Sequence, residues 1–421
     1  MSKKRIGNVE LDNDTITVNL MNHPSCVNSF IRCVNLAIKR KHHLINIVFK
    51  CEKEGIFPNA CLPISALIQE YQKLYDIEFN LHIDNNAYLK HCCFKKPLEL
   101  SKENIEKMRE PMDKIFCYTG ESGQVAAIVQ AYIDCLSRTA SCEEGVLAGL
   151  IWCINEVMDN VLVHSKETKG YVMAQYHKSS KIFAICVFDC GIGIYSSLSK
   201  SEKHKPASEI DSLTMAVQEG VGDGKGQGNG LFGLYQIVNE NGGELCITSG
   251  ESSIKLKNSE LKKHDKIAIV SDAHKGTVVD FKLNLSKKID IKTALKSIGG
   301  FDGFDIRLDN MLDDNDFLRY DVYDNCSGTG TRIAGEELRN DVLNTIRRMN
   351  APIILDFVGV KACSSSFIDE FIAKMVVEIG FLKFNELVKI ENMNDTVKHL
   401  CERSIAMRTH ETWSKVINQN Q

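Results

Sequence analysis

The densest run of glycines in this 421-residue chain lies in GVGDGKGQGNGLFGLYQIVNEN, which occupies residues 220–241. The glycines come first and apolar residues at helical spacing follow them, so the stretch predicts a glycine-rich loop that leads into a helix. Such a loop offers free backbone N–H groups and the positive end of a helix to phosphate groups. The glycines by themselves also fit a flexible linker, but the apolar helix directly after them favours a phosphate loop.

Upstream of this run, a long amphipathic helix is predicted in VLAGLIWCINEVMDNVLVHS, at residues 146–165. Glu156 and Asn160 are four residues apart and therefore share one face of that helix. An Asn oxygen can ligate Mg²⁺, and a Glu one turn away can activate a water or a hydroxyl. Polar pairs at this spacing are also common on ordinary helix surfaces, so the interpretation depends on the neighbouring motifs.

Between these two segments, an apolar strand is predicted in KIFAICVFD, which ends at Asp189 and is followed by Gly191 and Gly193. A carboxylate at the end of a strand can accept a hydrogen bond from an exocyclic amine, and glycines let the backbone approach a flat ring. Asp189 alone also fits a strand that ends in a turn. Together, the three segments place nucleotide-binding chemistry in one part of the chain.

These segments, with a fourth at residues 276–281, resemble the GHKL superfamily of ATP-binding domains. NEVMDNVLVHS matches the N box of the family, DCGIGI its first glycine box, GKGQGNGLFGL its second, and GTVVDF its closing threonine segment. Members include DNA gyrase, heat-shock chaperones, histidine kinases, the MutL mismatch-repair proteins and anti-sigma-factor kinases. The resemblance covers about residues 141–285 and implies a two-layer α/β sandwich that binds ATP and Mg²⁺.

The resemblance also implies a role for each matching residue. Glu156 would act as the general base, and Asn160 would hold Mg²⁺. Asp189 and Thr277 would lie at the adenine, and the glycines that follow Lys225 would approach the phosphates. The positions implied to contact the nucleotide are Asn160, Asp189, Gly191, Gly193, Lys225, Gly226, Gly228, Gly230, Leu231 and Thr277. Residues 196–221 correspond to the ATP lid of the family.

The two ends of the chain are predicted to form small α/β domains, at residues 1–100 and 297–405, with the ATP-binding domain at 101–290 between them. In both ends a helix, an apolar strand, a loop, a helix and a strand follow one another in the same order. Strands are predicted in ELCITS at residues 244–249, IAIVS at 267–271, FDIRL at 304–308, YDVYD at 320–324 and KFNELVKIEN at 383–392. The predicted fold class is therefore α/β (α+β), with a mixed central sheet. Residues 406–421 are predicted to form a polar tail.

The C-terminal stretch LDFVGVKACSSSFIDEF, at residues 355–371, resembles STAS-like domains, which are relatives of the anti-anti-sigma fold. The N-terminal domain shares only the order of strands and helices. Members of that fold carry an Asp directly before a phosphorylated Ser, whereas Cys363 precedes the serines at 364–366 here. Ser366 and Asp369 instead predict a capping box at the start of a helix.

Composition narrows the possible functions. The net charge of −4 gives no drive toward nucleic acid, and the basic cluster KRKHH at residues 39–43 fits a solvated helix end. No apolar run is expected to reach the roughly 18–20 residues of a membrane span. The stretch MSKKRIGNVELDND is not expected to be a secretory signal, because it contains no apolar region. The 16 cysteines include no CxxC pair, which predicts reduced core residues in the cytosol and no structural metal.

Two functions fit these motifs. One is a slow ATPase or Ser/Thr protein kinase of the anti-sigma type, regulated by the STAS-like part. The other is an ATP-gated interaction switch with little catalysis, which would control binding of a protein partner or formation of a homodimer. A nucleic-acid enzyme of the gyrase or MutL type is disfavoured because the chain has no basic charge balance. A sensor histidine kinase is disfavoured because it needs an upstream pair of dimerisation helices, and an α/β part is predicted there instead. His164 is expected to be structural, and Arg332 to be a solvated surface cation.

Overall fold

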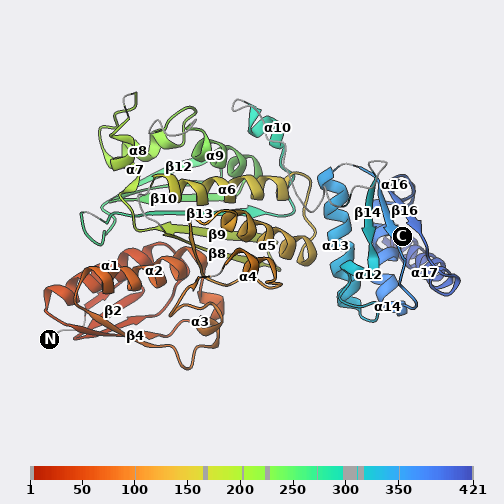
Figure 1. The fold of residues 1–421 in the computed structure, drawn as a ribbon, viewed down its shortest axis with the longest axis horizontal. Coiled ribbons are helices and arrows are strands. Elements are labelled where there is room, and N and C mark those ends of the chain that lie inside the picture. The colour runs from red at the N-terminus through yellow and green to blue at the C-terminus, as the bar shows by residue number, and fades with distance from the viewer. Residues whose placement is uncertain are drawn as a thin grey trace. The chain divides into compact units, whose positions relative to one another are not determined.

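The computed structural model describes residues 4–99, 101–164, 169–201, 203–222, 228–272, 274–296, 311, 317–349 and 351–419. The chain divides into two compact units that both combine helices with sheets (Figure 1). Unit 1 consists of Met1–Ile133, Gly149–Asn284 and Ile289–Phe301, and unit 2 of Asp134–Ala148, Leu285–Lys288 and Asp302–Gln421. The α/β class predicted from the sequence is confirmed.

The N-terminal layer of unit 1 is a five-stranded sheet whose strands lie in chain order. They are β1 (Lys4–Ile6), β2 (Val9–Asp12), β3 (Thr15–Val18), β4 (Leu44–Phe49) and β5 (Glu78–His82). The first three form an antiparallel meander, whereas β3, β4 and β5 pair in parallel. Parallel neighbours need crossover connections, and α1 (Ser25–Lys39) and α2 (Pro58–Leu74) provide them. The strand–helix alternation predicted for this part of the chain is confirmed.

The second sheet of unit 1 has eight strands in the order β12-β11-β10-β13-β9-β8-β7-β6. Its strands are β6 (Leu98–Glu99), β7 (Phe116–Thr119), β8 (Lys169–His177), β9 (Ile182–Asp189), β10 (Glu244–Ser249), β11 (Ser252–Lys257), β12 (Glu260–Asp265) and β13 (Thr277–Asn284). Neighbours are antiparallel except β6 and β7. The other helices up to residue 296 are η1 (Lys53–Gly55), α3 (Ala87–His91), α4 (Lys102–Glu106), α5 (Gln124–Thr139), α6 (Val146–His164), α7 (Gly193–Leu198), α8 (Glu209–Ala216), α9 (Gly230–Asn241) and α10 (Ile291–Ala294).

Helices cover both faces of the eight-stranded sheet (Figure 1). On one face α6 and α9 pack so closely that a Cβ added at Gly233 would meet the ring of Trp152. On the other face the buried side chains of α1 and α2 share one core with Cys186 and Phe188 of β9. Successive side chains of a strand point to opposite faces, so the apolar run of β9 reflects burial on both sides.

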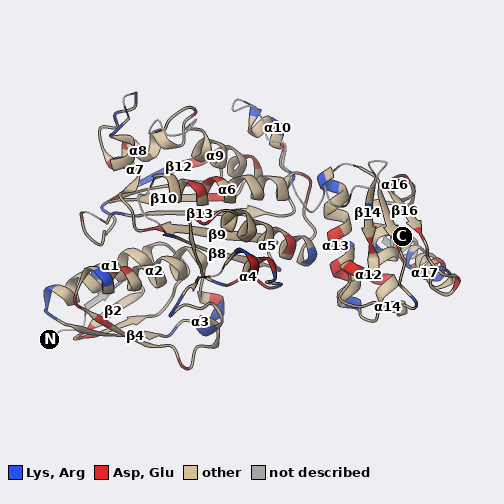
Figure 2. Ribbon diagram, in the orientation of Figure 1, with Lys and Arg blue, Asp and Glu red and all other residues tan. Residues whose placement is uncertain are grey.

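The segment IAIVS at residues 267–271 is predicted to be a strand, and the structure corrects this prediction because it forms no sheet ladder. Its backbone is held instead by side chains of α1. Asn28 Oδ1 accepts from the Ala268 N–H at 2.8 Å, and Asn35 Nδ2 donates to the Ile269 carbonyl at 3.1 Å. The segment is apolar because it packs against α1. The β11–β12 hairpin before it is not predicted, since β12 is exposed and consists mostly of charged residues (Figure 2).

The prediction for α6 is confirmed, because Leu147, Leu150, Ile151, Ile154, Met158 and Val161 form a stripe that is buried throughout. The window Val146–Val163 also has the length and composition of a membrane span, and it is the one such helix in the described part of the chain. It corrects the expectation that no apolar run reaches that length. However, 61% of the window is buried inside the protein, as in the core helix of a globular domain.

Unit 2 contains a sheet of three parallel strands in chain order, β14 (Leu318–Asp321), β15 (Ile353–Asp356) and β16 (Val388–Glu391). Its later helical segments are α12 (Val322–Asn325), α13 (Arg332–Met349), α14 (Ser365–Ile368), η3 (Asp369–Ala373), α15 (Lys374–Ile379), α16 (Phe381–Leu387) and α17 (Asp395–Gln419). Like β3–β5, these strands are joined by helical crossovers. The similar order of elements at the two ends of the chain therefore corresponds to a similar strand topology.

Several predicted boundaries in unit 2 differ from the structure. The strand predicted at residues 304–308 lies outside the described residues. The strand predicted at 320–324 ends at Asp321, whose side chain accepts from the Asp324 N–H at 2.8 Å and thereby caps α12. The strand predicted at 383–392 is confined to β16, and α17 continues through most of the predicted polar tail.

Candidate functional site

Glu156 and Asn160 lie on α6 where this helix meets the first residue of α9. A Cβ added at Gly230 would lie 2.5 Å from Glu156 Oε2 and 3.2 Å from Asn160 Nδ2. A side chain at position 230 would therefore displace the Glu156 carboxylate from this place. The side chain of Asn229 does not cap α9 and instead accepts from the Gly220 N–H at 2.9 Å. The positive end of α9 consequently faces the two polar side chains.

Glu156 has the electrostatic character of a potential base. Burial, and then the negative charge of Asp159, raise the pKa of the Glu156 carboxyl. Burial also raises the pKa of Asp159. Burial and the charge of Asp159 thus move the pKa of Glu156 toward the neutral range, in which a general base works best.

Asp189 lies at the end of β9, directly opposite Thr277 of the neighbouring strand β13. The side chain is buried, with 3% of its surface exposed, and its Oδ1 accepts from the Gly191 N–H at 2.7 Å. Gly276 has a φ of 65°, and a Cβ there would lie 2.7 Å from the Asp189 carbonyl oxygen. The predicted aspartate, threonine and first glycine thus belong to one compact corner.

Ser249, at the end of β10, completes this corner and is not predicted from the sequence. Its Oγ accepts from the Ile194 N–H at 2.8 Å and lies 3.1 Å from Thr277 Oγ1. A Cβ at Gly193, the first residue of α7, would come within 2.9 Å of that oxygen. The only feature of the sequence that points to Ser249 is its position as the last residue of the apolar strand ELCITS, and this feature is weak.

Tyr118 connects the Asp189 corner to α6. Its hydroxyl donates to the Met158 carbonyl at 3.2 Å. Burial, followed by the charges of Asp189 and Asp159, raises the pKa of Tyr118 well above its usual value. Phe188 lies in the core that β9 shares with α1 and α2, and successive side chains of a strand point to opposite faces, so Asp189 points to the face that α6 covers. The two groups of predicted residues therefore lie on the same face of the sheet.

The predicted lid contains α8, which is tied to the rim of this site by Glu209. The Glu209 carboxylate pairs with Lys275 and accepts from the Glu251 N–H. The hydrogen bond with Glu209 raises the pKa of Lys275. Ser208 caps α8 by accepting from the Asp211 N–H at 3.2 Å. The Glu209–Lys275 pair is not predicted, because 66 residues separate its members and no local pattern links them.

The phosphate end of the predicted site is described only in part. Lys225 and Gly226 lie outside the described residues, and so does the side chain of His164. Gly228 packs against the backbone at Val221, and a Cβ there would lie 2.7 Å from the Val221 carbonyl carbon. Leu231 occupies the first turn of α9 and is partly buried.

In unit 2, the predicted capping serine is wrong by two positions. Ser364, not Ser366, caps α14 by accepting from the Phe367 N–H at 3.1 Å. Asp369 does not close a capping box, because it pairs with Arg408. Arg332 is 57% exposed, as expected, but lies 3.2 Å from the buried carboxylate of Glu370.

Comparison with known proteins identifies part of unit 2. Residues 334–398 match a family model described as a STAS-like domain of unknown function (DUF4325). The match begins in α13 and ends in α17, so the predicted STAS-like character of the C-terminal part is confirmed. No curated protein matches the chain.

Proposed function

We propose that this protein is an ATP-binding regulatory protein of the GHKL type, in which unit 1 binds ATP with Mg²⁺ and unit 2 supplies a STAS-like module. The main support is that Asp189, Thr277, Glu156 and Asn160 lie on the same face of the eight-stranded sheet. These residues come from strands and a helix far apart in the sequence. Their chemistry matches the base, the phosphates and the metal of a nucleotide.

In this proposal Asp189 recognises the base. A buried carboxylate oriented by the Gly191 N–H accepts a hydrogen bond from the exocyclic amine of adenine. The hydroxyls of Ser249 and Thr277, 3.1 Å apart, hold the adjacent strand end in place. Since burial excludes competing water, this recognition is worth more than an exposed contact.

Asn160 is the residue that would hold Mg²⁺. The fit is reasonable because the Asn160 amide, the Glu156 carboxylate and the uncapped start of α9 all meet around Gly230. Oxygen ligands of this kind suit Mg²⁺. When bound, the ion would neutralise charge on the phosphates. Glu156 would accept the proton of a water or of a protein Ser/Thr hydroxyl while the oxygen of that group attacks the γ-phosphorus and ADP leaves, which gives slow hydrolysis or phosphoryl transfer.

The decisive experiment is ATP binding by calorimetry with wild type and Asp189→Asn. We expect the substitution to weaken binding at least tenfold, because an amide presents one acceptor and no charge to the amine. Asp84→Asn, in an exposed turn, is the control and should bind like wild type. Unchanged binding by Asp189→Asn would show that the adenine assignment is wrong.

Glu156→Gln separates the two candidate activities. If the protein hydrolyses or transfers phosphate, the substitution should lower turnover about 10²-fold or more while ATP still binds. Absence of turnover in wild type, with ATP bound, would favour the non-catalytic switch. A specific observation supports that alternative. The Glu209–Lys275 pair holds the lid to the rim, so a bound nucleotide that displaces it would move the lid.

A further inference from the structure

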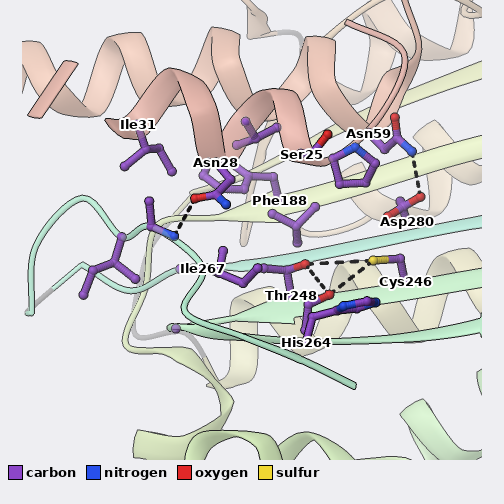
Figure 3. A pocket seen from close by; sticks show the side chains of 18 of the residues that line it. Ser25, Asn28, Ile31, Asn59, Phe188, Cys246, Thr248, His264, Ile267 and Asp280 are labelled. Atoms are coloured by element: carbon purple, nitrogen blue, oxygen red, sulfur yellow. Dashed lines mark hydrogen bonds between the residues drawn. The ribbon is translucent and has the colours of Figure 1, made fainter. Parts of the chain in front are cut away.

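A second cavity, of about 520 Å³, lies on the opposite face of the eight-stranded sheet from the proposed ATP site (Figure 3). Its roof comes from α1 and α2, its floor from β10, β11 and β13, and one wall from residues 267–270. All of its walls belong to unit 1. Protein interiors contain few voids larger than a water molecule, whereas small-molecule sites have volumes of about 300–1,000 Å³. The size of the cavity therefore suits a ligand better than a packing defect.

Val278 of β13 lies on the floor of the cavity and is left partly uncovered. It pairs with Phe188 of β9 on one side and with Thr248 of β10 on the other, so it belongs to the interior of the sheet. Paired residues point to the same face, and Phe188 lies in the core shared with α1 and α2, so Val278 points toward these helices. Its side chain is nevertheless only partly buried, since it borders the cavity. An apolar ligand would complete the removal of this side chain from water.

The wall at residues 267–270 is fixed in place by hydrogen bonds that leave the cavity open. Asn28, Arg32 and Asn35 of α1 bond to the backbone at residues 266–269, over distances of 2.8–3.1 Å. The bond from Asn28 is drawn in Figure 3. The hydroxyl of Tyr75, directly after α2, donates to the backbone of the same wall at 3.3 Å. Because these bonds hold the wall without a ligand, the cavity is formed in advance, as is usual for small-molecule sites.

The charged groups around the cavity balance one another. Three lysines and three acidic residues line it, namely Lys255, Lys275, Lys282, Glu244, Asp265 and Asp280. Glu244 lies 3.4 Å from Lys282 and 3.9 Å from Lys255, and Lys275 pairs with Glu209. The described lining therefore offers no excess charge to an ionised ligand, and burying an unpaired ion is costly. This balance favours an uncharged ligand.

Thr248 supplies a hydrogen-bonding group beside Val278. Its hydroxyl donates to Ser253 Oγ at 3.0 Å (Figure 3). A hydroxyl oxygen also has two lone pairs, so Thr248 Oγ1 can accept a hydrogen bond from a ligand while it keeps this bond. The Thr248 side chain is partly exposed and lines the cavity. One N–H or O–H group on an otherwise apolar ligand would therefore find a partner here.

We propose that this cavity binds an uncharged, mainly apolar small molecule that carries one hydrogen-bond donor. The apolar body would pack between Val278 and Phe188 of the sheet and Ile31 of α1. The donor would bind to Thr248 Oγ1. One molecule of this kind covers the uncovered valine and disturbs none of the ion pairs around the cavity. The site is independent of the proposed ATP site.

Two fluorescent dyes with the same skeleton test this proposal on the full chain without nucleotide. N-phenylnaphthylamine is neutral and has one N–H, whereas anilinonaphthalenesulfonate adds a negative charge to the same rings. We expect the neutral dye to bind saturably, with one molecule per chain, and at least tenfold more tightly than the sulfonate. Equal or tighter binding of the sulfonate would overturn the preference for an uncharged ligand, and no binding of the neutral dye would overturn the site.

Variants that fill the cavity locate the site. Val278→Phe places a larger apolar side chain in the cavity from the floor, and Ala268→Phe does so from the wall, so each should weaken binding of the neutral dye at least tenfold. Val358→Phe, in an exposed turn of unit 2, is the matched control and should bind like wild type. Unchanged binding by both cavity variants would place the dye elsewhere and overturn the proposal. The dye comparison uses only wild-type protein, so the proposal remains testable even if the variants fold poorly.

Discussion

At the scale of single residues, Asp280 predicts a pH dependence of stability. Burial raises the pKa of its carboxyl from 3.8 to about 6. The folded state therefore holds a proton that the unfolded state releases between about pH 4 and pH 6, so this group's contribution falls as the pH rises through that range. The total loss is about 2–3 kcal/mol. Below about pH 4 both states are protonated and the contribution is fully present.

Asp280→Asn should remove this dependence, because an amide does not titrate and can still accept from Asn59. We expect urea unfolding of the variant to show a smaller fall in stability between about pH 4 and pH 6 than wild type. Other buried carboxyls, such as Glu156, titrate equally in both proteins and cancel in the comparison. Parallel stability curves for wild type and variant would contradict the assignment of the raised pKa to Asp280.

Gly230 predicts a second residue-scale effect. Gly230→Ala would place a Cβ 2.5 Å from Glu156 Oε2, so either α9 or the Glu156 side chain must move. Because the Glu156 side chain can move away, and because alanine favours a helix over glycine by up to about 1 kcal/mol, we expect little change in unfolding free energy but weaker ATP binding. Gly120→Ala is the control, because nothing lies within 4 Å of its added Cβ. If both variants bind ATP like wild type, the close approach of α9 to Glu156 does not matter for the site, and this prediction is contradicted.

At the scale of elements, the Glu209–Lys275 pair should hold α8 in place. The two side chains are 15% and 23% exposed, so their interaction is less screened than that of a surface pair. We expect Glu209→Gln to increase amide hydrogen exchange in α8 while the exchange of β9 stays unchanged. Glu260→Gln breaks an exposed ion pair with Lys262 and should change neither. Unaltered exchange in α8 after Glu209→Gln would mean that the pair does not restrain the lid.

The elements also show what a sequence can and cannot predict here. The buried stripe of α6 and the apolar run of β9 are local patterns, and both elements are found where they are expected. The segment at 267–271 is also apolar, but α1 rather than a neighbouring strand supplies its hydrogen bonds. Which partner covers an apolar segment is a property of the tertiary structure, so no local pattern contains it.

The same distinction between local patterns and tertiary contacts applies to the candidate site. Asp189, Glu156 and Asn160 are predicted because glycines and a helical spacing mark them in the sequence. Ser249 and the Asn59–Asp280 pair carry no such mark, and the members of that pair are 221 residues apart. Only the pairing of β10 with β13, and the packing of α2 on that sheet, bring these groups together.

At the scale of the whole molecule, unit 2 includes a segment from far upstream in the chain. Asn344 of α13 accepts from the Cys142 N–H at 2.8 Å and donates to the carbonyls of Ser137 and Ala140. Asp341, one turn earlier, accepts from the Ser137 hydroxyl at 2.6 Å and from Tyr320 at 2.8 Å. The STAS-like part thus uses residues 137–142 as part of its own buried surface, so its stability depends on more than the C-terminal sequence.

Asn344→Ala tests this dependence, because it leaves the Cys142 N–H and two carbonyls in a buried region without their partner. We expect unit 2 to lose about 2–4 kcal/mol of stability, seen as faster hydrogen exchange in α13 and β15. Exchange in β9 of unit 1 should stay unchanged, since each unit has its own core. Asn325→Ala, an exposed asparagine with one local hydrogen bond, serves as the control. If exchange rises equally in β9 and β15, the two units unfold together and the division of the chain into two independent units is wrong.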